Sequence, residues 1–268
     1  RGSSAFGINI NYDKNNYIYK SSSNPKIAIK KKEYNNFIDE KLKLASRQKT
    51  FFNYFGQTRL VTNGSKFFYK NNQPISLKRI TGLHNGIILS NDEKELDNSK
   101  KNYESFEMKS DTLSFFEKLE QKTEESNESI IKFFMEFIEE IDGTFSIAFM
   151  DLKEQILLIS SNTGSLYYFH DAEKKIFVYA SEKMILEKFI ANSKFFNNHK
   201  IEIKKIINKS IVLNYVTHEV EIFDNLNFNK KINISINQNK SYDIITNEQE
   251  DLKRLNSLNK CSKCILPE

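Results

Sequence analysis

Three short segments of the chain carry side chains that together could bind and polarise a small molecule. Arg59 ends an apolar run, where its guanidinium could hold a carboxylate through two parallel hydrogen bonds. Asn85 and Gly86 place an amide side chain beside a glycine N–H, and two such donors could stabilise an oxyanion. Asp111 offers a carboxylate that could bind an ammonium group. A carboxylate binder, an ammonium binder and an oxyanion hole describe a pocket for an α-amino acid whose side-chain carbonyl is attacked.

Each of these segments also has a purely structural interpretation. Arg59 alone could be a surface arginine. Asn85-Gly86 lies between two apolar arms within residues 79–90, and Asn-Gly is the strongest short-range signal for a hairpin turn. Asp111 could be the N-cap of the helix that is expected to begin there. The functional interpretation therefore depends on the three segments acting together.

A second candidate centre is the sequence Cys261-Ser262-Lys263-Cys264. Two thiolates at this spacing supply half of a tetrahedral zinc site, and a structural site needs two further ligands. The four histidines are scattered and do not show the second spacing of a zinc ribbon. Cys261 and Cys264 could thus belong to a zinc site completed by residues outside this chain, be ordinary thiols, or form a redox pair.

Hydrophobic periodicity predicts the elements that must position these residues. Strands are expected at residues 5–12 and 55–61, and helices at 33–45, from 111 onward, and at 130–141. After residue 143 the period changes to two, and four short segments at 144–151, 155–160, 166–169 and 176–180 predict an antiparallel meander. Further alternating segments cover 210–215 and 220–223, and a polar linker is expected from residue 237.

Composition excludes several classes of protein. Lys and Arg number 40 and Asp and Glu number 35, so the net charge is only +5, and no stretch combines basic residues with stacking aromatics as nucleic-acid binders do. No apolar run approaches the roughly 18 residues that a membrane helix needs. Two cysteines cannot form a disulfide framework. We therefore expect a soluble, cytoplasmic α+β protein with no nucleic-acid or membrane partner.

The ordered set of motifs resembles the glutaminase domain of class II glutamine amidotransferases, which belong to the N-terminal-nucleophile hydrolases. Residues 3–8 are similar to the family's opening Cys-Gly-Ile-x-Gly-Ile, and residues 56–64 to Gly-His-Thr-Arg-x-Ala-Thr-x-Gly. Residues 84–87 resemble the His-Asn-Gly motif, and residues 110–112 resemble Ser-Asp-Thr-Glu. Weaker similarity at residues 141–148 and 180–182 extends the likeness over residues 3–190.

The resemblance implies an αββα sandwich, in which two antiparallel sheets pack between helical layers. It implies a glutaminase that hydrolyses L-glutamine to glutamate and ammonia without a cofactor. The nucleophilic cysteine of the family falls at Ser3. By motif position, Arg59 would hold the substrate α-carboxylate and Asp111 its α-ammonium, Asn85 and the Gly86 N–H would form the oxyanion hole, and Thr62 and Asn63 would line the pocket.

The sequence departs from the family pattern where the chemistry is most demanding. Ser3 is a much weaker nucleophile than cysteine at neutral pH, and two residues precede it, so its α-amino group is tied up in a peptide bond. Gln57 replaces the usual histidine, and Leu113 follows Thr112 where the family has glutamate. The Arg-Gly-Ser opening resembles a protease-site or cloning remnant. We expect the chain as it stands not to turn over glutamine, although its pocket could bind it.

Residues 261–268 resemble the opening of the ATP pyrophosphatase family that amidates sugars and includes asparagine-synthetase-like domains. The resemblance implies a glutaminase domain over residues 3–236 and, over residues 237–268, a linker and the start of a truncated synthetase or zinc module. The absent synthetase domain, in cis or in trans, would bind ATP and Mg²⁺ and complete the zinc site.

Three other functions remain open: a catalytically dead glutamine-binding or structural module of the same fold, an N-terminal-nucleophile hydrolase that acts on a different amide, or an unrelated α+β interaction domain.

Overall fold

The computed structural model describes residues 2–12, 15–47, 51–60, 69–89, 110–126, 128–196, 201–225 and 231–232. All of them belong to the first of the two units into which the chain divides, residues 1–233. The domain boundary expected at residues 236 and 237 lies outside the described residues and remains a prediction. None of the described helices is both long and apolar enough to cross a membrane.

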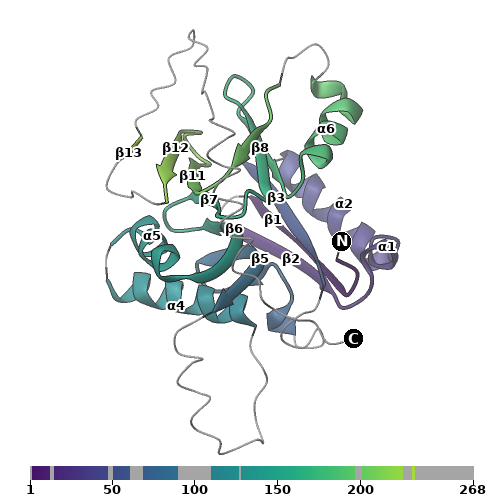
Figure 1. Cartoon of the computed structure of the whole chain (residues 1–268). Coiled ribbons are helices and arrows are strands. Elements are labelled where there is room, and N and C mark those ends of the chain that lie inside the picture. The colour runs from purple at the N-terminus through teal and green to yellow at the C-terminus, as the bar shows by residue number, and fades with distance from the viewer. Residues whose placement is uncertain are drawn as a thin grey trace, which may run out of the picture. The chain divides into compact units, whose positions relative to one another are not determined.

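A seven-stranded antiparallel sheet forms the centre of this unit (Figure 1). Its strands, in spatial order, are β13 (Lys231–Ile232), β12 (Val220–Asp224), β11 (Lys209–Asn214), β7 (Ile156–Ser161), β6 (Asp142–Asp151), β5 (Ile80–Leu89) and β4 (Ile75–Ser76). Helices α4 (Asp111–Glu125) and α5 (Ile130–Glu140) cover one face. The core between helices and sheet is rich in phenylalanine, with Phe116, Phe134 and Phe149 fully buried.

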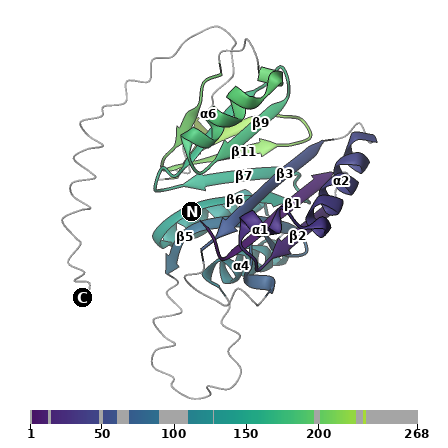
Figure 2. The same ribbon diagram turned by 90° about the vertical axis from the view of Figure 1, so that its right-hand side faces the viewer.

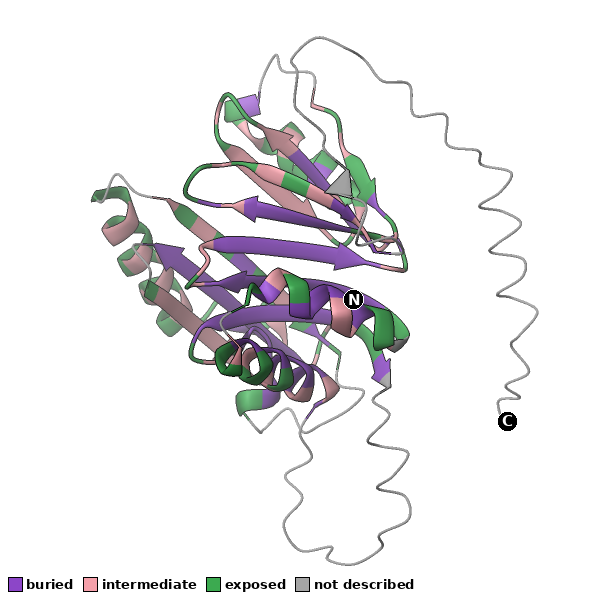
Figure 3. Cartoon of the chain, turned by 90° about the vertical axis from the view of Figure 1, so that its left-hand side faces the viewer, coloured by how far each residue is buried: buried purple, intermediate pink, exposed green. Residues whose placement is uncertain are grey.

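The second β layer consists of two three-stranded sheets (Figure 2). One has the order β2 (Asn15–Ser21), β1 (Ala5–Tyr12), β3 (Phe52–Arg59), and the other β10 (Lys204–Ile206), β8 (Leu166–Asp171), β9 (Ile176–Ala180). A shared apolar cluster joins both to the large sheet, through Phe55 of β3 and Tyr168 of β8, for example. Strand β1 of the second layer and β7 of the large sheet are buried along their whole length (Figure 3).

Helices cover the outer faces of the two smaller sheets. The helices α1 (Pro25–Ala28) and α2 (Lys32–Arg47) pack on the β2-β1-β3 sheet, where Phe6 and Ile8 meet Phe37. Helix α6 (Lys183–Asn192) and the 3₁₀ turn η2 (Lys194–Phe196) pack on the other. The layers therefore run helix, sheet, sheet, helix, and the predicted αββα architecture is confirmed.

Two expectations about the strands are wrong. The predicted meander is interrupted, because β11 occupies the free edge of β7 and β8 must begin a separate sheet. The hairpin expected at Asn85-Gly86 does not form, because all ten residues of β5 pair with β6, from Ile80 opposite Asp151 to Leu89 opposite Asp142. Gly86 is required for a different reason. Its φ is +148°, and a Cβ there would collide with the carbonyl oxygen of Thr144 on β6.

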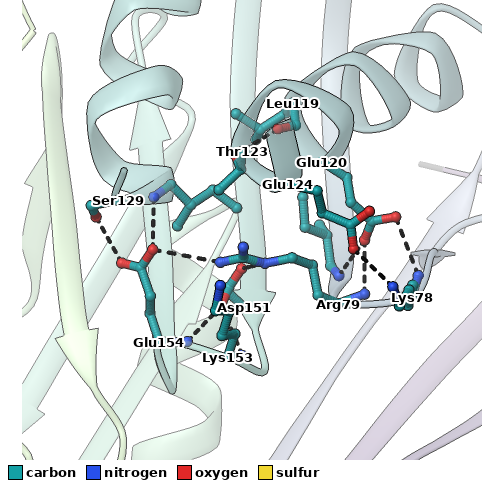
Figure 4. A network of polar contacts seen from close by, with 12 residues as sticks. Lys78, Arg79, Leu119, Glu120, Thr123, Glu124, Ser129, Asp151, Lys153 and Glu154 are labelled. Carbon is teal, nitrogen blue, oxygen red and sulfur yellow. Dashed lines mark hydrogen bonds and ion pairs between the residues drawn. The ribbon is translucent and has the colours of Figure 1, made fainter. Parts of the chain in front are cut away.

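A buried ion pair fixes the start of β5 against the end of β6 (Figure 4). Arg79 Nε donates to Asp151 Oδ2 over 2.5 Å, and both side chains are buried. Glu120 of α4 accepts the Arg79 and Ile80 backbone N–H groups at 2.7 and 3.1 Å. Glu154 accepts the Ile130 N–H, at the first turn of α5, over 2.7 Å. One polar network thus connects β5, β6 and both helices.

Asp151→Asn keeps the shape of the side chain and removes its charge. We expect the free energy of unfolding to fall by about 3 kcal/mol, because the buried Arg79 guanidinium loses its nearer counter-ion and keeps only the longer contact with Glu154, at 3.5 Å. Urea denaturation measures the change. Glu187→Gln is the control: it breaks an exposed pair with Lys183 and should cost less than about 0.5 kcal/mol. Equal effects of the two substitutions would contradict the role given to the buried pair.

Candidate active site

Arg59 is the last residue of β3 and lies opposite Ala5 of β1. Only 8% of its surface is exposed, so the interpretation of Arg59 as a surface arginine is wrong. Its Nη1 donates to Asn72 Oδ1 over 3.0 Å. A buried guanidinium must keep its hydrogen bonds and a nearby negative charge, since an unpaired buried cation is costly.

Asp111 is the first residue of α4. The N-cap expected at Asp111 is instead Ser110, whose hydroxyl accepts the Leu113 N–H over 3.2 Å. The Asp111 carboxylate accepts the Thr112 N–H over 2.8 Å and the Ile88 N–H of β5 over 3.3 Å. The positive end of the helix dipole also favours an anion at this position. The carboxylate is thus held where α4 begins beside β5.

The structure brings Arg59 and Asp111 into one electrostatic neighbourhood. Burial lowers the pKa of Arg59, and the Asp111 carboxylate raises it in opposition. A cation and an anion that influence each other in this way carry the two charges needed to match an amino-acid zwitterion. Sequence reasoning assigned these two residues to binding, and they are 52 positions apart (111 − 59) in the chain.

His84 lies close enough to the Asp111 carboxylate to be influenced by its charge. It was not among the predicted site residues. It belongs to β5, is 3% exposed, and its Nδ1 lies 3.0 Å from Thr112 Oγ1. Burial lowers the pKa of His84, while the Asp111 carboxylate and the Thr144 carbonyl raise it. The net direction is downward, so the imidazole is neutral at pH 7. Its other nitrogen, Nε2, is buried and has no hydrogen-bond partner among the described residues.

A run of amide side chains, Asn71 to Gln73, holds this arrangement together. It follows the 3₁₀ turn η1 (Tyr69–Asn71), and all three residues are buried. Asn71 Oδ1 accepts the Ser110 N–H over 2.9 Å, and Asn72 binds Arg59 as described. The Gln73 side chain forms hydrogen bonds with both backbone groups of His84. Its Oε1 accepts the His84 N–H at 2.7 Å, and its Nε2 donates to the His84 carbonyl at 2.8 Å. Sequence reasoning missed this segment, and its only signal was three consecutive amide residues before Pro74.

Asn85 and Gly86 follow His84 directly on β5, and both are exposed. Because side chains alternate along a strand, Asn85 lies on the same face as Leu83, which packs between the two β layers. Its neighbour across the strand pair is Ser146 of β6. The structure therefore places the predicted oxyanion donors beside His84, at the open end of the interface between the sheets.

Ser3 is exposed and lies two residues before Ala5, the first residue of β1. The next residue, Ser4, donates its N–H to the Arg59 carbonyl over 2.9 Å, so position 3 lies at the same end of the β1–β3 pair as Arg59. Gly2 packs so closely on β3 that a Cβ there would collide with the Thr58 carbonyl. Gln57, which stands where the family has histidine, donates from Nε2 to the His84 carbonyl over 3.1 Å.

Four predicted site residues lie outside the described residues: Thr62, Asn63, Cys261 and Cys264. In the described part of the chain no group of three or more His, Cys, Asp or Glu residues could hold a metal ion. The zinc interpretation of Cys261 and Cys264 stays a prediction.

Asp111→Asn should lower the pKa of His84 further below its usual value of about 6.5, because the carboxylate that favours the imidazolium is lost. An NMR titration of the ring Cε1 proton measures this pKa. Asp171→Asn is the matched control. It should leave His84 unchanged and lower the pKa of His170, whose charged form Asp171 stabilises. An unchanged His84 pKa in Asp111→Asn would show that the carboxylate does not act on the ring.

A comparison with known proteins shows which protein family resembles the segment that contains Arg59, His84 and Asp111. Residues 57–188 match the sequence model of the glutamine amidotransferase domain family. A search of curated proteins finds no match. Among solved structures, a glutamine phosphoribosylpyrophosphate amidotransferase from B. subtilis, complexed with ADP and GMP, is similar with a TM-score of 0.51 and 14% identity. An allosteric regulatory enzyme of purine biosynthesis is similar with a TM-score of 0.55 and 15% identity.

In both comparisons 84% of this chain is covered, and the chain spans only 43% of the length of the solved proteins. At 14% and 15% sequence identity, these two similarities show a shared fold and nothing further. The fold is similar to that of these two solved proteins, and residues 57–188, which include Arg59, His84, Asn85, Gly86 and Asp111, match a glutamine amidotransferase domain.

Proposed function

We propose that this chain is a glutaminase domain whose pocket binds L-glutamine. Arg59 holds the α-carboxylate and Asp111 the α-ammonium, while Thr62 and Asn63 line the pocket. The observation that carries the proposal is the placement of a buried guanidinium and a helix-terminal carboxylate in one electrostatic neighbourhood. Asn85 and Gly86 are exposed on β5, three and two residues before Ile88, whose N–H donates to the Asp111 carboxylate over 3.3 Å. In the proposed complex their N–H groups face the side-chain carbonyl of the substrate.

The reaction needs a nucleophile at position 3 with a free α-amino group. A cysteine thiolate there attacks the amide carbon of glutamine, and the carbonyl electrons move to oxygen, which Asn85 and the Gly86 N–H stabilise. Each such donor contributes roughly 3–4 kcal/mol to lowering the barrier. The α-amino group takes the thiol proton and passes it to the departing nitrogen, so ammonia leaves and a thioester remains. Water then attacks the thioester, which releases glutamate and restores the thiol.

Ser3 and the two residues before it block this reaction at its first step. A hydroxyl is far less acidic than a thiol, and the nitrogen of residue 3 is an amide that cannot accept a proton. We therefore propose that the chain as it stands binds glutamine without hydrolysing it.

We propose that a full-length protein passes the ammonia to an ATP- and Mg²⁺-dependent synthetase domain in the cytoplasm. Two observations support this proposal: the chain spans 43% of the length of two solved proteins of similar fold, and residues 261–268 resemble the start of a sugar-amidating domain. Cys261 and Cys264 would supply half of a zinc site there. A catalytically dead glutamine-binding or structural module is the second candidate, favoured by Ser3 at the nucleophile position.

The decisive experiment combines Ser3→Cys with removal of residues 1 and 2, so that the cysteine is the first residue. We expect this protein to release glutamate from L-glutamine, as measured with a coupled glutamate assay, while the Ser3 chain releases none. Arg59→Ala in the same protein should abolish release because the α-carboxylate loses its partner. Arg47→Ala, which removes an exposed arginine at the end of α2, is the control and should keep full activity. Full activity of Arg59→Ala would instead favour a hydrolase acting on a different amide.

Glutamine binding to the Ser3 chain, measured by calorimetry, tests the pocket without the chemistry. Arg59→Lys keeps the charge and loses the planar pair of donors, so we expect affinity to fall at least about tenfold, equivalent to about 1.4 kcal/mol. Binding without glutamate release by the trimmed Ser3→Cys protein would support the non-catalytic module. A folded chain that does not bind glutamine would contradict the amidotransferase proposal.

A further inference from the structure

A cleft of about 430 Å³ lies outside the proposed glutamine pocket, between β2, η1, β4 and α4. Its wall is apolar in one part and charged in another, with contributions from Ile18, Leu77, Leu113, Lys20, Lys70 and Glu117. None of the residues assigned to glutamine binding lines it. The volume lies in the range of small-molecule sites, which typically combine an apolar wall with a few placed polar groups.

Lys20 is the unusual member of this wall. Its Nζ lies 4.6 Å from the centre of the Tyr69 ring and 3.4 Å from the Tyr69 carbonyl oxygen. In the part of the chain that the structure describes, no carboxylate lies within ion-pair distance of it. Burial lowers the pKa of Lys20 to about 8. A cation–π contact and one long hydrogen bond offset only part of the cost of burying an ammonium group.

We propose that this cleft binds a small organic anion, whose single carboxylate or phosphate group contacts Lys20 and Lys70 and whose apolar part packs on Ile18, Leu77 and Leu113. An anion supplies the counter-charge that Lys20 lacks, and two lysines are suited to such a group.

The cleft shares two elements with the proposed glutamine pocket, and this part of the inference rests on the proposed function. Tyr69 and Lys70 belong to η1, which leads directly into the Asn71–Gln73 segment that holds Arg59, Ser110 and His84. Leu113 belongs to α4, which begins at Asp111. An anion in the cleft therefore changes the affinity for glutamine, and glutamine changes the affinity for the anion by the same factor.

The test is an NMR titration of the ¹⁵N-labelled full chain with three probes: butyrate, butyl phosphate and inorganic phosphate. We expect saturable shifts at the cleft with butyrate or butyl phosphate, and the stronger of the two identifies the acidic group. Inorganic phosphate, without an apolar part, should bind at least tenfold more weakly. The affinity for the preferred probe should fall as the pH rises above about 8, because the free Lys20 ammonium loses its proton.

Lys20→Met and Lys70→Met should each weaken binding at least tenfold, while Lys30→Met, which removes an exposed lysine outside the cleft, should leave it unchanged. Thermal melting checks the fold, and the exposed Lys70 provides a variant that does not disturb the core. No saturable shift with any probe, or unchanged binding in Lys20→Met, would overturn the site.

A second glutamine titration, with the anion at saturation, tests the coupling, and an unchanged glutamine affinity would overturn it. The anion titration contains no glutamine, so a failure of the proposed function leaves its outcome unaffected.

Discussion

The candidate site depends on the register between β5 and β6, at one end of which lies the buried ion pair of Arg79 and Asp151. This pair holds the start of β5 against the end of β6, and every residue of β5 pairs in sequence. A slip of one residue would exchange the two faces of the strand. His84 would then leave α4, and Asn85 would leave the interface between the sheets. The pairing of β5 with β6 thus decides which side chains of β5 lie on the side of the proposed glutamine pocket.

Amide side chains provide most of the internal support of the site. A carboxamide offers both a donor and an acceptor without a charge, so Asn71, Asn72 and Gln73 can satisfy a helix N–H, a guanidinium and a strand main chain in turn. Charged residues in the same places would add desolvation costs. Arg59 and Asp111 remain as the charged groups of the arrangement, and each is held from behind by neutral partners or backbone N–H groups.

Elements with strong hydrophobic periodicity were predicted correctly from the sequence. The prediction failed for elements whose structure depends on contacts with residues far away in the chain. Helix α5 was predicted because its apolar face alone specifies it. Strand β2 was missed, since its polar residues become a strand only when β1 pairs with them. The Asn-Gly signal predicted a turn, and pairing of β5 with β6, some sixty residues later in the chain, prevents it. Arg59, Asn85 and Asp111 were assigned roles through their motifs. His84 stands in the same motif as Asn85 but received no role, because its burial against Thr112 depends on a contact between β5 and α4, and no motif marked the Asn71–Gln73 segment.

The division of the second β layer into two sheets has a consequence for how such a domain can diversify. The β2-β1-β3 and β10-β8-β9 sheets share no ladder, and each has its own helical cover. Side-chain packing in the shared apolar cluster joins the two halves, but no backbone hydrogen bond of one ladder belongs to the other. Arg59 belongs to the β2-β1-β3 half alone. The outer surface of α6 can therefore change in evolution without breaking a hydrogen bond of the strands that carry this proposed binding residue.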